Sequence, residues 1–483
     1  MDAIIPVTTQ DLSLIYPQIA LAVFIVAVLL LDLLVSSEDK VQTAVFSFVS
    51  VVIAGYFSWR LWGASATAFG GMLIVDNFSL FFNLIFLSAC GLTVLMSVRY
   101  LKAEEINLGE YYVLLLVATL GMMIMAAAGN LLIVFLGIET LSISLYVLAG
   151  MNRKRMVSGE AALKYLLLGA FATGFLLYGM ALIYGATGTI DLKELAQRLA
   201  GAEETEPLLL VGMVLMMAGF AFKASLVPFH FWAPDVYQGA PTPATAFMAT
   251  GGKAAAFAVF FRVFTTALPE LQAHWGPVLW ALAILTMTVA NVTALWQENV
   301  KRMLAYSSVA HAGYLLIAVL AGGEWGRASL IFYLAAYTLM NIGAFGVLTA
   351  LSRKGNANET LDDIRGLGFR RPALAAAMAL FMLSLGGIPP TAGFLAKLYV
   401  FAAGVREGLL PLVIIAVVNA VISIYYYLRV VVFMYMREPE NGLEAEPPSL
   451  FETAGLLICA AGVLALGIFP GLILNIVNGA ILW

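Results

Sequence analysis

Charged residues are scarce in this chain. Only 11% of its 483 residues are Asp, Glu, Lys or Arg, whereas 62% are hydrophobic and the mean hydropathy is +0.96. An ordinary soluble domain contains about 25% charged residues, so this composition excludes a soluble globular enzyme. Disordered chains are rich in charge and poor in aromatic residues, so disorder is excluded as well. The lipid bilayer is the solvent that suits such a chain.

Cysteine and histidine are also rare. Cys90 and Cys459 lie far apart in apolar runs, and there is no Cys-x-x-Cys motif. An iron–sulfur cluster needs several thiolates close together, so we expect none on this chain. The histidines, at positions 230, 274 and 311, are too dispersed to predict a haem or metal site. The net charge of −4 offers no basic footprint for nucleic acid.

Long apolar runs dominate what is present. A helix needs about 20 apolar residues to cross a bilayer. Fourteen stretches meet this requirement, at 13–35, 41–62, 75–98, 110–128, 130–150, 158–184, 208–229, 242–265, 277–296, 302–321, 328–352, 371–405, 409–437 and 451–475. The start of the chain lacks the positive flank of a signal peptide, so we expect the first run to remain as a helix. The longest loops, 185–207 and 352–371, are too short for a soluble domain. We therefore predict an all-α polytopic membrane protein.

Lys and Arg in the loops predict the orientation. One set of alternate loops holds fourteen of these residues and the other set holds six. The richer set, which includes 153–155 and 353–371, should face the cytoplasm. The poorer set consists of Arg60, Lys193, Arg198, Arg262, Arg327 and Arg406. An even number of spans then places both termini on the outer side. We expect a multi-pass membrane protein.

Several ionisable residues fall inside the predicted spans. A charge at a helix centre costs about 2.5–3.5 kcal/mol on insertion scales, so such residues persist where they pair or line a wet cavity. They are Glu139, Lys164, Lys223, Lys253, Lys397 and Arg429. Structural alternatives stay open for each: a protonated Glu139, a Lys253 bonded to freed carbonyls, and lysines 164, 223 and 397 whose side chains reach the interface. We interpret Arg429 as an interface anchor.

A row of buried lysines with one carboxylate suits proton transfer. A lysine removed from water can exchange a proton near neutrality, and a nearby carboxylate changes how tightly that proton is held. Small polar residues near the row could link it through hydrogen bonds: Ser142, Ser144, Thr245, Ser307, Ser308, His311, Tyr314 and Asn341. For each of these, a simple helix–helix hydrogen bond is the competing role.

Two spans are interrupted, the seventh near Pro228 and the twelfth near Pro389. Interrupted helices at corresponding positions of two halves indicate inverted repeats, with the working groups at the breaks. The predicted repeats are 110–265, helices 4–8, and 277–437, helices 9–13. A three-helix segment, 1–109, precedes them and a last helix, 451–483, follows. Lys223 lies before its break and Lys397 after its break, so the two lysines differ in register.

Four motifs resemble the antiporter-like subunits of proton-translocating NADH–quinone oxidoreductase, respiratory complex I. They are GIETLSISLY at 137–146, GEAALKYLLLGAFATG at 159–174, FKASLVPFHFWAPDVYQGAPTP at 222–243 and GGIPPTAGFLAK at 386–397. The resemblance covers essentially the whole chain. The second motif and the 14-span length are similar to the branch called subunit N, the counterpart of mitochondrial subunit 2.

The resemblance implies a role for each buried ionisable residue. Glu139 would pair with Lys223, and Lys164 would modulate that pair. Lys253 would be the central relay, Lys397 the terminal group, and His311 a bridge between them. It also implies no cofactor on this chain: FMN, iron–sulfur clusters and quinone would belong to partner subunits. The partners would be other membrane subunits, above all sister antiporter-like subunits, together with lipid and protons.

Two other functions remain open at this stage. Multisubunit sodium/proton antiporters share the core fold, so the chain could be a subunit of such an antiporter. The chain could also be a membrane scaffold without an ion path. Mutation of Glu139 separates the scaffold from both transporters, and activity in sodium-free buffer separates the two transporters from each other.

Overall fold

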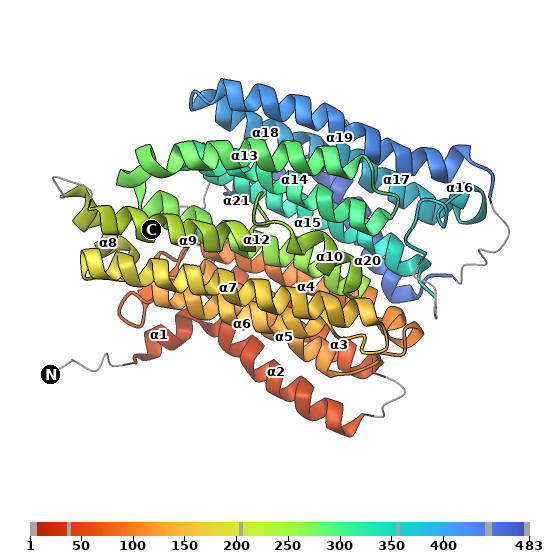
Figure 1. Ribbon diagram of the computed structural model, residues 1–483. Coiled ribbons are helices and arrows are strands. Elements are labelled where there is room, and N and C mark those ends of the chain that lie inside the picture. The colour runs from red at the N-terminus through yellow and green to blue at the C-terminus, as the bar shows by residue number, and fades with distance from the viewer. Residues whose placement is uncertain (1–6, 36–39, 202–205, 354–357, 440–446, 478–483) are drawn as a thin grey trace.

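The computed structural model describes residues 7–35, 40–201, 206–353, 358–439 and 447–477. Within them, eleven helices are long and apolar enough to cross a membrane, and three shorter apolar helices accompany them: Glu110–Ala126, Pro207–Lys223 and Pro372–Gly386. The prediction of fourteen spans in an all-α membrane fold is confirmed. The helices run roughly parallel, with connections at the two ends of the bundle (Figure 1). The extreme termini, 1–6 and 478–483, lie outside the described residues.

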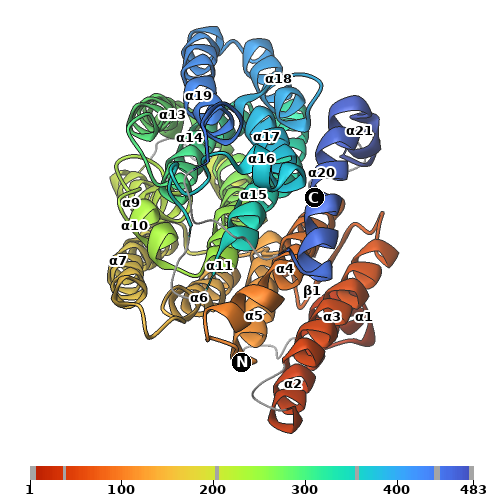
Figure 2. The same ribbon diagram turned by 90° about the vertical axis from the view of Figure 1, so that its right-hand side faces the viewer.

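The N-terminal segment contains three spans and a small hairpin. Its elements are α1 (Thr9–Leu14), α2 (Tyr16–Leu34), α3 (Val41–Arg60), β1 (Ala66–Ala68), β2 (Leu73–Val75) and α4 (Asn77–Ala103). The antiparallel pair β1–β2 adds two short strands that the sequence analysis did not predict. Figure 2 shows α2 and α3 at the edge of the bundle, whereas α4 lies inside it.

The next part of the chain carries spans four to eight. Its elements are α5 (Glu110–Ala126), α6 (Leu131–Ala149), α7 (Met156–Thr187), α8 (Leu192–Ala200), α9 (Pro207–Lys223), α10 (Trp232–Gly239), α11 (Thr242–Phe247), η1 (Met248–Gly252), α12 (Lys253–Arg262) and η2 (Val263–Ala267). Elements η1 and η2 are π-helical turns within span eight. A π-turn inside a membrane helix is often found at a functional site, and η1 ends directly before Lys253.

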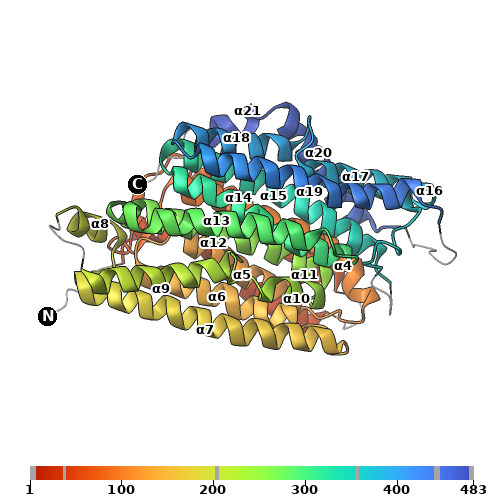
Figure 3. The same ribbon diagram turned by 45° about the horizontal axis from the view of Figure 1, so that its top comes forward.

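The remaining spans follow the same plan. Their elements are η3 (Pro269–Leu271), α13 (Gln272–Ala294), α14 (Val300–Ala321), α15 (Gly323–Leu351), α16 (Leu367–Arg370), α17 (Pro372–Gly386), α18 (Ala392–Arg406), α19 (Leu410–Met436), α20 (Leu450–Ile468) and α21 (Gly471–Val477). Figure 3 shows α7, α9 and α13 side by side along one flank. Helices α14 and α15 are almost wholly buried in the centre, as Figure 2 shows for α15.

Both predicted helix breaks are present. The seventh span stops at Lys223 and resumes at Trp232, and the twelfth stops at Gly386 and resumes at Ala392. Proline cannot donate a backbone hydrogen bond, which explains why neither span continues. At the second break Gly387 adopts a positive φ of 84°. A Cβ at Gly393 would lie 1.8 Å from the Ser384 carbonyl oxygen, so only glycine lets α18 start this close to α17.

The packing of the two halves repeats in its pairs. Helix α5 packs on α6 as α13 packs on α14, and α7 packs on α9 as α15 packs on α17 and α18. These matching pairs support the proposed repeats 110–265 and 277–437. The exact boundaries of the four segments stay a prediction.

Two cations near helix ends are buried, one of which, Arg262, was predicted to lie in a loop. The Arg262 side chain is 1% exposed, and its Nη2 lies 2.8 Å from the Asp76 carboxylate at the start of α4. The Lys301 side chain is 0% exposed and lies 3.1 Å from Glu359. Because the carboxylate partners lie far away in the sequence, no local pattern indicated that these cations are paired. Each pair fixes the end of one helix to a distant part of the chain.

We expect loss of the Glu359 carboxylate to destabilise the fold strongly. Breaking a buried ion pair by removing one partner costs about 3–5 kcal/mol, because the other charge is left buried. Glu359→Ala should therefore lower the melting temperature of the purified complex by several degrees. Glu105→Ala is the matched control, since Glu105 pairs with Lys154 at side-chain exposures of 44% and 68%. Equal melting temperatures for the two variants would contradict this assignment.

Candidate functional site

Glu139 and Lys223 lie close together but do not form a direct ion pair. The half-buried Glu139 is on α6, and its carboxylate accepts a hydrogen bond of 2.9 Å from Thr173 on α7. Lys223, in the last turn of α9, donates to the Ser142 hydroxyl at 2.6 Å and lies 3.4 Å from the Tyr146 hydroxyl. Ser142 is one helical turn from Glu139. Glu139 and Lys223, which the resemblance pairs, each bond to a neighbouring hydroxyl group and not to each other.

A small cavity extends from Lys223 toward the next lysine. Its volume is about 20 Å³, and its lining includes Lys223, Ser142 and Gly252. A cavity needs roughly 10–15 Å³ and polar partners to hold a water molecule, so one fits here. Gly252 directly precedes Lys253 in the chain. The cavity therefore lies between the first and second lysines of the row.

Lys253 lies at the start of α12 and is 2% exposed. Its ammonium donates a hydrogen bond to the backbone carbonyl of Ser308 on α14. This contact matches the structural alternative in which Lys253 bonds a carbonyl. It also joins the eighth span to the tenth, which carries His311 three residues later.

His311 contacts tyrosines and neither lysine. Its Nδ1 lies 2.6 Å from the Tyr333 hydroxyl and its Nε2 lies 3.1 Å from the Tyr427 hydroxyl. Tyr427 also hydrogen-bonds the Ser307 hydroxyl. Ser307 and His311 were predicted from the sequence, whereas Tyr333 and Tyr427 were not. Tyr427 belongs to the tyrosine run 425–427, in which Tyr426 and Tyr427 are both buried.

Helix α14 carries the connection to the last lysine. Ser308, His311 and Tyr314 follow one another at intervals of three residues, so consecutive members are neighbours on the helix surface. The Lys397 ammonium lies 5.6 Å from the centre of the Tyr314 ring. Thus α14 contacts Lys253 at one turn and Lys397 about two turns further along.

Lys397 is 5% exposed and reaches back across the second break. Its ammonium donates to the carbonyls of Leu385 and Gly386, each at 2.9 Å. These carbonyls belong to the last turn of α17, where a helix leaves its acceptors unpaired. This geometry fits a structural cation, and it also fits a lysine that holds a proton among neutral acceptors.

Lys164 lies apart from the Glu139 region. Its side chain is 41% exposed and pairs with Glu160 and with Asp235 on α10, both at 2.8 Å. Arg302, at the start of α14, binds the other oxygen of Asp235 at 2.8 Å. The structure thus places Lys164 in a cross-link between the two halves of the chain. Asp235 was missed, although its motif at 222–243 had been singled out.

The remaining intramembrane cation, Arg429, donates to the Leu295 carbonyl at 3.0 Å and lies 3.5 Å from the Gln297 carbonyl. Leu295 is the C-cap of α13, and a cation is favourable at a helix C-terminus. The half-buried Arg429 therefore caps a helix end and lies outside the row of lysines.

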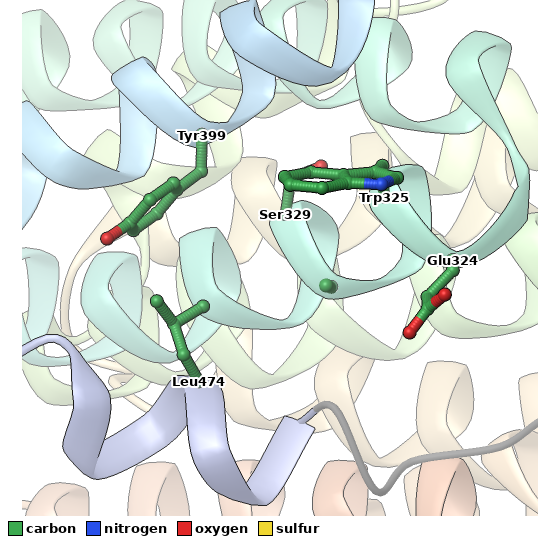
Figure 4. A pocket seen from close by; sticks show the side chains of 6 residues that line it. Glu324, Trp325, Ser329, Tyr399 and Leu474 are labelled. Carbon is green, nitrogen blue, oxygen red and sulfur yellow. The ribbon is translucent and has the colours of Figure 1, made fainter. Parts of the chain in front are cut away.

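A larger cavity, of about 380 Å³, contains none of the predicted site residues. It lies between α15, α18 and α21, and Figure 4 shows the side chains of Trp325, Tyr399 and Leu474 around it. Its lining consists of Glu324, Trp325, Ala328, Ser329, Tyr399 and Leu474. Because none of these residues belongs to the row from Lys223 to Lys397, we do not assign this cavity to the proton path.

Comparison with known proteins gives a consistent result. The family model described as NADH:quinone oxidoreductase/Mrp antiporter, TM, matches residues 128–423. NADH-quinone oxidoreductase subunit N of Trichlorobacter lovleyi is 49% identical, over 98% of this chain and 97% of the relative.

Solved structures separate the likeness of fold from the likeness of sequence. A chain of respiratory complex I from Thermus thermophilus, with bound aureothin, has 38% identity and a TM-score of 0.82, covering 96% of this chain and 100% of that one. A chain of the Mrp complex from Dietzia sp. has a TM-score of 0.83 but only 21% identity, covering 98% and 97% of the two chains, so it shows the fold alone. Identity this high over nearly the full length means that the chain belongs to the NADH-quinone oxidoreductase subunit N family.

Proposed function

We propose that the chain is a proton-translocating, antiporter-like membrane subunit of NADH–quinone oxidoreductase. The observation that carries this proposal is the line of ionisable groups through both halves of the bundle, from the half-buried Lys223 through the buried Lys253 and His311 to the buried Lys397. Family membership supplies the enzyme to which such a line would be coupled. Electron transfer from NADH to quinone in partner subunits would drive proton movement along this line.

The redox groups would belong to those partners. Cys90 on α4 and Cys459 on α20 are both buried and unpaired, and two isolated thiols cannot supply the ligand set of an iron–sulfur cluster. FMN, the clusters and the quinone site are therefore assigned to other subunits. The bundle would lie in a bacterial inner membrane beside sister antiporter-like subunits, with both termini on the outer side.

In this proposal, protons move by short transfers between neutral acceptors. Lys223 is poised between Ser142, Tyr146 and the small cavity that leads to Gly252. Lys253 would pass its proton along α14, whose hydroxyl and imidazole groups lie between it and Lys397. Glu139 contributes a negative charge one turn away from the acceptor of Lys223. A change in its position or protonation would alter how Lys223 holds its proton.

Glu139→Gln tests the role of this charge. The amide oxygen can still accept from Thr173, so the variant should assemble. A charge one turn away interacts with about 2–3 kcal/mol at an effective dielectric constant near 20. Because about 1.4 kcal/mol is a factor of ten, we expect NADH–quinone turnover and proton pumping to fall at least about tenfold. Glu160→Gln, an exposed carboxylate on α7, is the control. Wild-type rates in Glu139→Gln would remove this charge from the mechanism and favour a scaffold.

The position of each lysine predicts which of two variants is more damaging. Lys253 is buried beside α14, whereas Lys164 is 41% exposed in a paired cluster. Lys253→Met should reduce protons pumped per NADH by at least about tenfold, because the gap in the row exceeds one hydrogen bond. Lys164→Ala should lower it less than about threefold, since exposed pairs contribute at most about 1 kcal/mol. Membranes with matched subunit levels give the comparison, and the reverse order would refute the argument.

Lys397 allows proton exchange to be separated from structural support. Arginine can donate to the Leu385 and Gly386 carbonyls, but it cannot deprotonate in a protein. If Lys397 exchanges a proton, Lys397→Arg should pump no better than Lys397→Ala, at roughly a tenth of the wild-type proton yield or less. The measurement is proton pumping per NADH oxidised in vesicles. Near-full activity of the arginine variant, with loss in the alanine variant, would leave Lys397 as a structural charge.

The identity of the transported ion is tested in the same vesicles. Full turnover and pumping in sodium-free buffer would support protons as the transported ion. A strict requirement for sodium would favour the antiporter alternative instead.

A further inference from the structure

A further cavity lies near one end of the bundle and shares no lining residue with the row of lysines. Its volume is about 320 Å³. The hairpin loop after β1, the α5–α6 turn, the start of α8 and the end of span eight surround it. The segments are linked by backbone pairing: Leu73 with Ala128, and Asn130 with Asp191. The cavity is thus built from four separate parts of the chain that are held in fixed positions.

Arg262 belongs to the lining of this cavity and carries donors that no described residue uses. Its side chain is 1% exposed, and Nη2 lies 2.8 and 3.0 Å from the two oxygens of Asp76. The guanidinium carbon lies 5.0 Å from the centre of the Phe78 ring. Nε and Nη1 are buried and have no hydrogen-bond partner in the described chain. A buried charged donor left unsatisfied costs more than about 1–3 kcal/mol. The arrangement therefore favours an acceptor inside the cavity.

The other polar groups of the lining indicate what kind of acceptor fits. Lys193 adds a second positive charge, and the Thr67 and Thr266 side chains add hydroxyl groups to the lining. Asp191 contributes a carboxylate whose Oδ1 accepts from the Lys193 and Glu194 backbone amides, at 3.0 and 2.9 Å. Two cations and two hydroxyls match the oxygens of a phosphate group. The Asp191 carboxylate lies where an amine attached to that phosphate would be attracted.

The helix that borders the cavity, α8, is of a kind that lies near lipid head groups. Helix α8 is amphipathic: Leu192, Leu195 and Leu199 are buried, while Lys193 and Arg198 face outward. Such a helix lies in the interface between the bilayer and water. Hydrogen bonds from Thr189 and Arg198 hold the pKa of the neighbouring Glu194 carboxyl below its usual range, so the outward face of α8 carries charge.

We propose that this cavity, formed by Arg262, Lys193, Asp191, Thr67 and Thr266, is a binding site for a phosphate group, from either a phospholipid head group or free phosphate. The phosphate oxygens accept from Nε and Nη1 of Arg262 at the closed end. Lys193 contacts the phosphate from the open side. The site is independent of the proposed proton row, because it shares no residue with it.

The test uses the whole purified oxidoreductase complex containing this chain. Ala196 lines the cavity on α8, so Ala196→Phe fills the space and leaves the Arg262–Asp76 pair intact. Ala200→Phe is the matched control on the exposed side of the same helix. Native mass spectrometry counts phospholipids retained per complex, and melting curves with added inorganic phosphate report the free anion. We expect Ala196→Phe to weaken either the binding of phospholipid or the binding of inorganic phosphate by at least about tenfold, because the ligand can no longer make its charged hydrogen bonds.

A second variant covers failure of Ala196→Phe to assemble. Arg262→Lys keeps a charge beside Asp76 but removes the two unpartnered donors, and we expect the same weakening. Equal retention of phospholipid and an equal phosphate response in wild type, Ala196→Phe and Arg262→Lys would overturn the proposal, since the cavity would then hold water alone. If Ala196→Phe does not assemble, Arg262→Lys alone decides.

Asp191→Asn distinguishes the two sources of phosphate. Asparagine caps helices as well as aspartate does, so α8 should persist. For free phosphate, removal of the repelling carboxylate should tighten binding several-fold. For a head group that carries an amine, as in vesicles of phosphatidylethanolamine, the same change should weaken binding, whereas phosphatidylglycerol should bind more tightly. Each outcome supports the phosphate site and identifies what it holds.

Discussion

The acceptors of buried cations divide the charges of this protein into two kinds. Some buried cations face a carboxylate: Arg262 faces Asp76, Lys301 faces Glu359, and the half-buried Arg99 faces Glu452. The lysines of the proposed proton row bond to neutral oxygens instead, namely a hydroxyl at Lys223 and carbonyls at Lys253 and Lys397. A lysine paired with a buried carboxylate cannot release its proton without stranding a negative charge in a medium that solvates it poorly. A lysine that bonds to neutral acceptors can release its proton without leaving such a charge behind.

This division fits the irregular backbone beside two of the lysines, Lys397 and Lys253. An unbroken helix uses almost all of its carbonyls internally, so it offers a buried ammonium few neutral acceptors. The end of α17 supplies two free carbonyls to Lys397, and the π-turn η1 precedes Lys253 at the point where that side chain turns toward α14. The irregular backbone therefore lies inside the protein beside the ionisable groups, which is where a membrane protein can tolerate it. The central position of α14 lets hydroxyl and imidazole groups lie between the two lysines.

Local features of the sequence predicted local features of the structure. Hydropathy predicted fourteen spans, and proline with glycine predicted the two breaks, because both signals act within one helix. The ion pairs of Arg262 and Lys301 could not be predicted, since Asp76 and Glu359 are brought to them only by tertiary packing. The same holds for Tyr333 and Tyr427, which complete the surroundings of His311 from two other helices. Lys164 forms ion pairs with Glu160 and Asp235, and the partner on α10 is likewise brought to it by tertiary packing.

The different registers of the two break lysines are reconciled by where their ammonium groups end. Lys223 lies in the last turn of the first half-helix, α9. Lys397 lies five residues into the second half-helix, α18, yet its side chain extends backwards to the carbonyls that end the first half-helix, α17. In both cases a positive charge lies at the C-terminal end of the first half-helix. The helix dipole stabilises a cation there by about 0.3–1 kcal/mol at the surface, and by more where the site is partly buried. An inverted pair of repeats therefore has no need to retain the sequence position of its lysine. It needs only to bring the charge to the same end of the same half-helix, and a long flexible side chain can do this from either side of the break.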